Sequence, residues 1–140
     1  MNEIDLAYTA GIIDGEGCIC LSLVKEKNIR GRRQRLTVSV GNTDKRLTLW
    51  LKNMFGGHSV LQSRTRNNKD YYQWRVSSKK ASFFLSLILP YLKLKRRQAE
   101  LGIEFQEPIY QGRRIDDNTW GLQEAQRILM QSLNARGIKR

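Results

Sequence analysis

The stretch Thr9-Ala-Gly-Ile-Ile-Asp-Gly-Glu-Gly17 constrains the fold of this chain more than any other. It is an apolar, small-residue run that ends in two acids interleaved with glycines. We expect a helix over residues 4–14 that stops at residues 15–17, because glycine adopts backbone angles that other residues avoid. Gly11 needs a reason, since a glycine inside a helix costs about 1 kcal/mol relative to alanine. Close approach of a second helix is the simplest one.

The same helix carries small residues at positions i, i+3 and i+4, which share one helix face: Ala7, Ala10 and Gly11. We predict that this face packs against another helix. The run also leaves a carboxylate, that of Glu16, at the end of the helix.

The length and the net charge of the chain restrict its domain organisation and the class of its partner. The 140 residues predict a single domain that is large enough for a core. The net charge of +12 predicts a polyanionic partner, with nucleic acid ahead of an anionic membrane surface. No apolar run approaches the length of a membrane span, and no signal-peptide pattern is visible, so we expect neither.

The two cysteines argue for a reducing compartment. Cys18 and Cys20 are expected on the same side of one strand, which disfavours a disulfide between them. Two thiols with His58 do not make a zinc site. We therefore expect an intracellular protein with reduced thiols, located in the cytoplasm, the nucleoid, or an organelle stroma or matrix.

Hydrophobic periodicity predicts two β-hairpins and five helices. The expected strands are residues 18–25, 35–42, 58–64 and 71–76, and the expected helices are residues 4–14, 44–55, 78–89, 94–106 and 120–134. The order α-β-β-α-β-β-α with a C-terminal helix predicts an α+β fold, in which helices cover one face of a four-stranded antiparallel sheet. We expect a single domain with its core over about residues 4–105 and a C-terminal helical extension over residues 106–140.

Apolar positions predict which helix faces point inward. In the third helix these are Phe83, Phe84, Leu87 and Ile88. In the last helix they are Leu122, Ala125, Ile128, Leu129 and Leu133.

The other face of the sheet is predicted to be polar, basic and uncovered. A strand of about 8 residues spans roughly 25 Å, so paired strands can follow a DNA groove for most of a turn. An ordinary solvated face and a solvated basic loop are the alternatives. The predicted DNA contacts on this face and its hairpin loops are Ser22, Val24, Lys25, Lys27, Arg30, Arg32, Arg33, Arg35, Thr37, Ser39, Gln62, Arg64, Arg66, Tyr71, Gln73 and Arg75.

Residues 9–17 resemble the LAGLIDADG motif of homing endonucleases, with Thr9 in place of leucine and Glu16 in place of aspartate. The predicted order of helices and hairpins also matches that family. The segment 90–98, Pro-Tyr-Leu-Lys-Leu-Lys-Arg-Arg-Gln, resembles the basic segment that follows the third helix in single-motif members. The resemblance implies a four-stranded DNA-binding saddle with helices on its other face.

The resemblance also implies roles for individual residues. Glu16 matches the acid that binds the catalytic Mg²⁺ or another divalent cation such as Mn²⁺, and the carbonyl of Gly15 matches a backbone ligand. Asp14 matches an acid that holds the helix end. Asn42 and Arg46 match a pair that positions water and the scissile phosphate, although many members have glutamine where this chain has Asn42.

Lys95 matches a lysine near the attacking water, and its neighbours are candidates for plain phosphate contacts. Asn42 is alternatively a turn residue, and Arg46 a helix-surface residue. Each chain holds a single copy of the motif, so the resemblance implies a homodimer through the small-residue face of the first helix.

The implied function is a site-specific DNA endonuclease that uses a metal ion to cut both strands of a long, pseudo-palindromic site. Two other functions use the same scaffold. One is an RNA maturase with intron RNA as its partner, and the other is a DNA-binding regulator that has lost cleavage.

Overall fold

The computed structural model describes residues 2–25, 32–64, 69–109 and 116–135, without the side chains of residues 25, 32 and 62–64. In chain order the elements are α1 (Glu3–Glu16), β1 (Gly17–Lys25), β2 (Arg32–Asn42), α2 (Lys45–Phe55), β3 (His58–Arg64), β4 (Asp70–Ser77), α3 (Ser78–Ile88), the 3-10 turn η1 (Leu89–Tyr91), α4 (Arg96–Gln106) and α5 (Asp117–Asn134). The predicted α+β order is confirmed. Among the described residues, no helix is both long and apolar enough to cross a membrane.

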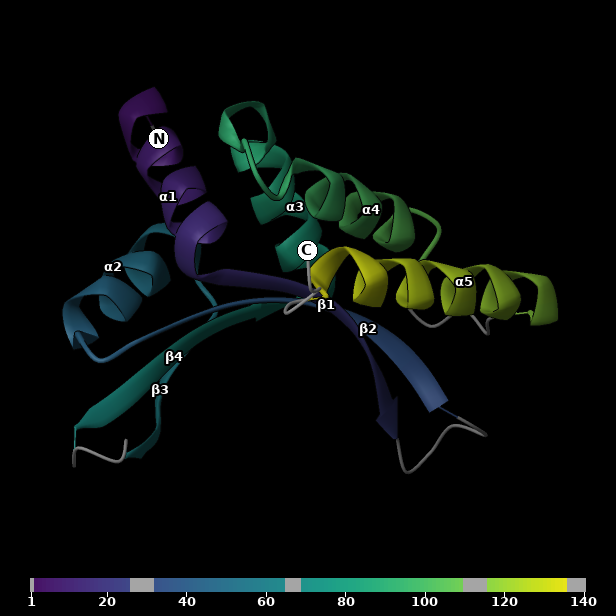
Figure 1. Cartoon of the computed structure of the whole chain (residues 1–140), viewed down its shortest axis with the longest axis horizontal. Helices are drawn as coiled ribbons and strands as arrows, with labels where there is room; N and C mark the ends of the chain where they lie inside the picture. Colours follow the sequence, from purple (N-terminus) through teal and green to yellow (C-terminus); the bar gives the residue numbers. More distant parts are fainter. Residues whose placement is uncertain (1, 26–31, 65–68, 110–115, 136–140) are drawn as a thin grey trace.

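The four strands form one antiparallel sheet in the order β1-β2-β4-β3. Figure 1 shows a bowed sheet with all the helices on its convex side and nothing over its concave side. We call that uncovered concave side the free face. The strand register determines which residues share this face. Cys18 lies opposite Ser39, and Ser39 lies opposite Arg75, so all three belong to it.

The core lies between the sheet and the helices. Alternate residues of the strands are buried there, as period 2 requires. Trp74 is the largest of them, and its indole N–H donates to the carbonyl oxygen of Gly56 over 2.8 Å. Its ring packs against Phe55 and Phe84. The buried apolar side chains of the strands are Ile19, Leu21, Leu36, Val38, Val40, Trp74 and Val76.

The junction between α1 and β1 depends on Gly17. The helix runs through Glu16, two residues beyond the predicted end, and the side chain of Asn2 caps its start. A Cβ at residue 17 would lie 2.8 Å from the Cα of Ile13. Only glycine therefore lets the chain turn from the motif helix directly into β1, an edge strand of the sheet.

The predicted inward face of α5 is wrong. Leu122 and Ile128 are 53% and 55% exposed, and Ala125 and Leu129 are exposed as well, whereas only Leu133 packs against the core. The helix instead buries Gln123, Gln126 and Met130.

Hydrogen bonds explain the rotated setting of α5. Asn134 Nδ2 donates to the carbonyl oxygen of Ile19 over 2.7 Å, and Gln98 Nε2 donates to the carbonyl oxygen of Leu133. Gln34 Nε2, on β2, donates to Glu124. These bonds determine the rotation of the helix against the sheet, and periodicity alone does not contain them.

The predicted inward face of α3 is wrong at one position. Phe83 is 65% exposed, and Leu85 is buried beside Phe84 and Ile88. The helix begins at Ser78, which has a positive φ of 56°. That start brings Ala81, Phe84, Leu85 and Ile88 onto one face.

Candidate active site

The end of α1 meets the end of β2. Because β1 follows α1 directly and pairs with β2, Gly17 lies opposite Val40, two residues before Asn42. Asn42 Nδ2 donates to Glu16 Oε2 over 3.0 Å. Glu16 is exposed at this point. Two residues that lie 26 positions apart in the sequence, and that were both predicted for the site, are thus in contact.

Asp14 holds a distant segment against the end of α1. Its carboxylate accepts the backbone N–H groups of Lys93, Leu94 and Lys95 over 2.9, 3.1 and 3.0 Å. These three residues lead into α4. The structural role predicted for Asp14 is therefore more specific than holding its own helix end, because Asp14 attaches the basic segment to the motif helix.

Lys95 reaches the same junction. Its ammonium group donates to the carbonyl oxygen of Gly17, the residue next to Glu16. The Lys95 side chain is half-buried, which restricts the positions that its ammonium group can reach. A cation is thus held at the carbonyl of the residue next to Glu16, where positive charge can stabilise an anionic group.

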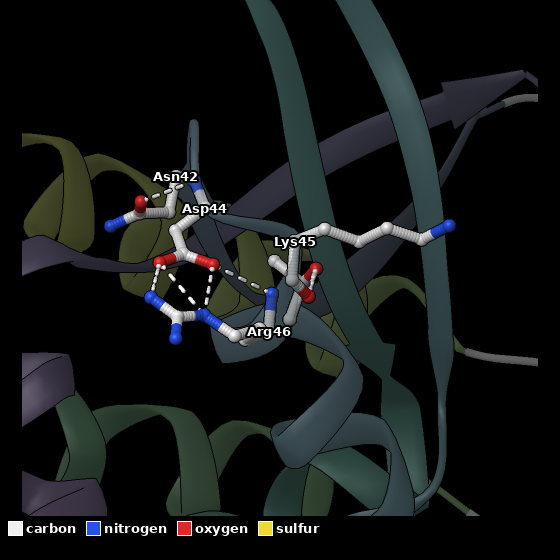
Figure 2. Close-up of polar contacts among 5 residues, drawn as sticks. Asn42, Asp44, Lys45 and Arg46 are labelled. Atoms are coloured by element: carbon white, nitrogen blue, oxygen red, sulfur yellow. Dashed lines mark hydrogen bonds and ion pairs between the residues drawn. The ribbon is translucent and has the colours of Figure 1, made fainter.

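Arg46 is present in the neighbourhood but is engaged elsewhere. Figure 2 shows its guanidinium on the carboxylate of Asp44, with Lys45 pointing away. The shortest of these contacts, from Nη2, is 2.7 Å, although the Arg46 side chain is 91% exposed. These hydrogen bonds lower the pKa of Asp44 to about 2 and raise that of Arg46.

Asp44 is the residue that sequence reasoning missed as part of the site. It caps α2 by accepting the N–H of Arg46. Its own N–H donates to Asn42 Oδ1 over 2.7 Å. The series Glu16, Asn42, Asp44 and Arg46 is therefore connected by hydrogen bonds. An Asn-x-Asp-x-Arg pattern at a strand-to-helix junction was the available signal.

The donor set suits a hard divalent cation. Glu16 supplies one carboxylate, and Gly15 lies in the last turn of α1, where main-chain carbonyls lack partners within the helix. No group of three or more His, Cys, Asp or Glu side chains that could enclose a metal occurs among the described residues. Magnesium needs only one or two carboxylates when substrate phosphates and waters complete its shell.

The free face presents the predicted DNA contacts that the structure describes. Ser22 lies opposite Arg35, and Arg75 Nη2 donates to Gln73 Oε1 over 2.6 Å. Tyr71 lies over Gly41, where any Cβ would meet the phenol ring. The remaining described members are Val24, Arg33, Thr37 and Ser39. Lys27, Arg30 and Arg66 lie outside the described residues, and the side chains of Lys25, Arg32, Gln62 and Arg64 are not described.

The profile of the family described as LAGLIDADG endonuclease matches residues 9–106. That span runs from the motif helix to the end of α4 and includes every residue of the site just described. The chain belongs to the LAGLIDADG endonuclease family. A search of curated proteins finds no match to this sequence.

Solved structures agree with this assignment of the fold. The homing endonuclease I-CvuI, solved in complex with the I-CreI target, is 22% identical with a TM-score of 0.81, over 99% of this chain and 86% of that chain. The archaeal intron-encoded homing endonuclease I-Vdi141I, complexed with DNA, is 17% identical with a TM-score of 0.80, over 99% and 89%. The LAGLIDADG homing endonuclease I-GzeII, in complex with its DNA target, is 22% identical with a TM-score of 0.67, and this chain covers 46% of it.

The two departures from the LAGLIDADG motif have local explanations. Thr9 is buried, and its hydroxyl donates to the carbonyl oxygen of Asp5 over 2.7 Å, so a polar residue is accommodated inside the helix packing. Glu16 is one methylene longer than aspartate, and it meets the short side chain of Asn42. Glu16, which is longer than aspartate, and Asn42, which is shorter than glutamine, together span the distance between α1 and β2.

The small-residue face of the motif helix needs one correction. Ala10 is fully buried in the core of the chain, so it is not available to a second helix at the surface. Ala7 and Gly11 are exposed, as is Gly15. A Cβ at Gly11 or Gly15 would meet nothing within 4 Å among the described residues. The described part of the chain therefore gives no steric reason for either glycine.

Proposed function

We propose that this LAGLIDADG protein is a site-specific DNA endonuclease that hydrolyses both strands of a long, pseudo-palindromic site as a metal-dependent homodimer. The observation that carries the proposal is the convergence of Glu16, Asn42 and Lys95 at the junction of α1 and β1, beside a basic free face. The complexes of I-CvuI and I-Vdi141I with DNA support double-stranded DNA as the partner.

Each side chain has a role that follows from its contacts. Glu16, with the carbonyl of Gly15, holds Mg²⁺ or Mn²⁺. When bound, the metal neutralises phosphate charge and makes water a better nucleophile. Asn42 orients the Glu16 carboxylate through its amide hydrogen bond. Lys95 supplies positive charge where the phosphate becomes more negative, and Arg46 contacts phosphate when it exchanges Asp44 for DNA.

A homodimer accounts for the single motif and the single carboxylate. Cutting two strands requires two such sites, and one chain supplies one. The exposed Ala7, Gly11 and Gly15 allow the backbone of a second motif helix to approach closely about a two-fold axis. I-GzeII supports this arrangement, because its chain is about twice as long as the part that this protein matches. A two-fold protein reads a pseudo-palindromic site.

The test is selection of cleaved sites from a randomised DNA pool in Mg²⁺, comparing the wild type with Glu16→Gln. We expect double-strand cuts by the wild type only, with DNA binding retained by Glu16→Gln. Binding of one site by both proteins without cleavage would support the regulator instead. Splicing of an intron that needs the protein but not Glu16 would make intron RNA the primary partner.

A further inference from the structure

Two thiols lie side by side on the free face, immediately after Gly17. Cys18 and Cys20 are at positions i and i+2 of β1, so their side chains leave the same face of the strand. Their register partners on β2 are Ser39 and Thr37, which belong to the predicted DNA contacts. Cys18 is exposed, Cys20 is half-buried, and neither is in a disulfide.

The two thiols are in contact. Cys18 and Cys20 are hydrogen-bonded, and this bond, followed by burial, raises the pKa of Cys20. The positive charge of Arg75 acts on Cys20 in the opposite sense, so a cation faces the pair. The Arg75 side chain is close because its residue lies opposite Ser39, the register partner of Cys18.

The geometry suits a bridging ion better than a disulfide. Residues i and i+2 of a strand have Cα atoms roughly 6.6 Å apart, near the upper limit for a disulfide, and their Cβ vectors are parallel. Two sulfurs on one zinc-like ion, each about 2.3 Å from it, are separated by about 3.8 Å. Thiols already close enough to hydrogen-bond need little movement to reach that separation.

We propose that Cys18 and Cys20 form a two-thiolate binding site for a soft, thiophilic ion of the class of trivalent arsenic or Cd²⁺, and that its occupation blocks DNA binding. Thiolate ligands select soft ions over Mg²⁺. The described residues add no His, Cys, Asp or Glu that would make the pair a three-ligand site. The ion therefore keeps open positions and projects from the free face. The blocking of DNA rests on the proposed function, whereas the site itself does not.

Phenylarsine oxide is a suitable probe because stable attachment needs two thiols. Its arsenic exchanges its bonds to oxygen for two As–S bonds, and the two thiol protons leave with that oxygen as water. No oxidant or reductant is consumed. A short dithiol such as 2,3-dimercaptopropanol competes for the arsenic and restores the free protein.

The experiment treats the full chain with one equivalent of phenylarsine oxide and measures intact mass, free thiols and DNA affinity. We expect one adduct per chain, loss of both free thiols, and at least a tenfold weaker affinity for a selected DNA site, all reversed by dimercaptopropanol. Cys18→Ser and Cys20→Ser are the matched controls. Each should form no stable adduct and should keep its DNA affinity in the presence of the arsenical.

Three results separate the parts of the inference. An adduct that is as stable in either serine variant as in the wild type overturns the two-thiolate site. An adduct on the wild type that leaves DNA affinity unchanged overturns the block. Untreated wild-type protein that binds no DNA overturns the proposed function, while the stoichiometry and thiol count still decide whether the site exists.

Discussion

Asp14→Asn tests the link between the motif helix and the basic segment. The Asp14 carboxylate accepts three backbone N–H groups, from Lys93, Leu94 and Lys95, across 79 to 81 positions of sequence. An asparagine keeps one acceptor oxygen and turns an NH₂ group toward a backbone donor. The change therefore removes both charge and acceptor capacity without altering the shape of the side chain.

The expected loss follows from these contacts. A hydrogen bond to a charged group contributes about 1.5–3 kcal/mol. The three bonds share one partly exposed carboxylate, and the amide retains some of them, so we expect the free energy of unfolding to fall by about 2–4 kcal/mol. For a chain of this length each kcal/mol lowers Tm by about 2–4 °C, which predicts a decrease of roughly 4–16 °C.

Activity should fall more than affinity. The segment that Asp14 holds also carries Lys95, whose ammonium group donates to the carbonyl oxygen beside Glu16. Loosening that segment displaces a cation from the reacting phosphate but leaves the free face intact. We expect the single-turnover cleavage rate to fall at least tenfold, about 1.4 kcal/mol of barrier, with DNA affinity within about twofold of the wild type.

Calorimetry and single-turnover cleavage provide the measurements, and Asp5→Asn provides the control. Asp5 loses the same charge from the same helix, near its start, where about 0.3–1 kcal/mol is at stake. Equal losses of stability in the two variants, or cleavage by Asp14→Asn at the wild-type rate, would contradict this role for Asp14.

The contacts also predict the effects of changes at Asp44, at two glycines and in α5. Asp44→Asn keeps a cap acceptor and removes the ion pair that Arg46 must give up to reach phosphate, so DNA affinity should rise by about two- to fivefold in fluorescence anisotropy. The pKa of Asp44 is lowered from 3.8 to about 2, so its contribution to stability is complete above pH 3.8 and disappears as the pH falls through about 2. In melting experiments the Tm values of Asp44→Asn and the wild type should therefore converge over that pH range. Gly17→Ala should lower the free energy of unfolding by about 1–3 kcal/mol, whereas Gly11→Ala should raise it by up to about 1 kcal/mol and weaken dimerisation in sedimentation equilibrium. Met130→Ala should cost about 2–5 kcal/mol in urea unfolding and Leu129→Ala less than half of that, the reverse of what hydrophobic periodicity indicates.

The local elements were predictable because they depend on short-range pattern. Alternation in the strands and small-residue spacing in the first helix reflect periods of 2 and 3.6, which hold wherever the segment lies. The acid at the end of the motif helix also needed only local sequence. The prediction failed at Phe83 and at Leu122, where the rotation of a helix depends on what it meets. For α5, hydrogen bonds from Gln34 and Asn134 select a polar side that periodicity would place in solvent.

The sequence by itself determined the elements, their order and the family-like motif, because propensity and periodicity are properties of neighbouring residues. Only the tertiary structure decided which distant groups meet. It placed Asn42 on Glu16, Lys95 beside Gly17, and the three N–H groups on Asp14. It also showed that Ala10, which was predicted at an interface, lies in the core. Contacts between residues tens of positions apart depend on how the sheet and helices pack, and packing is a property of the whole chain.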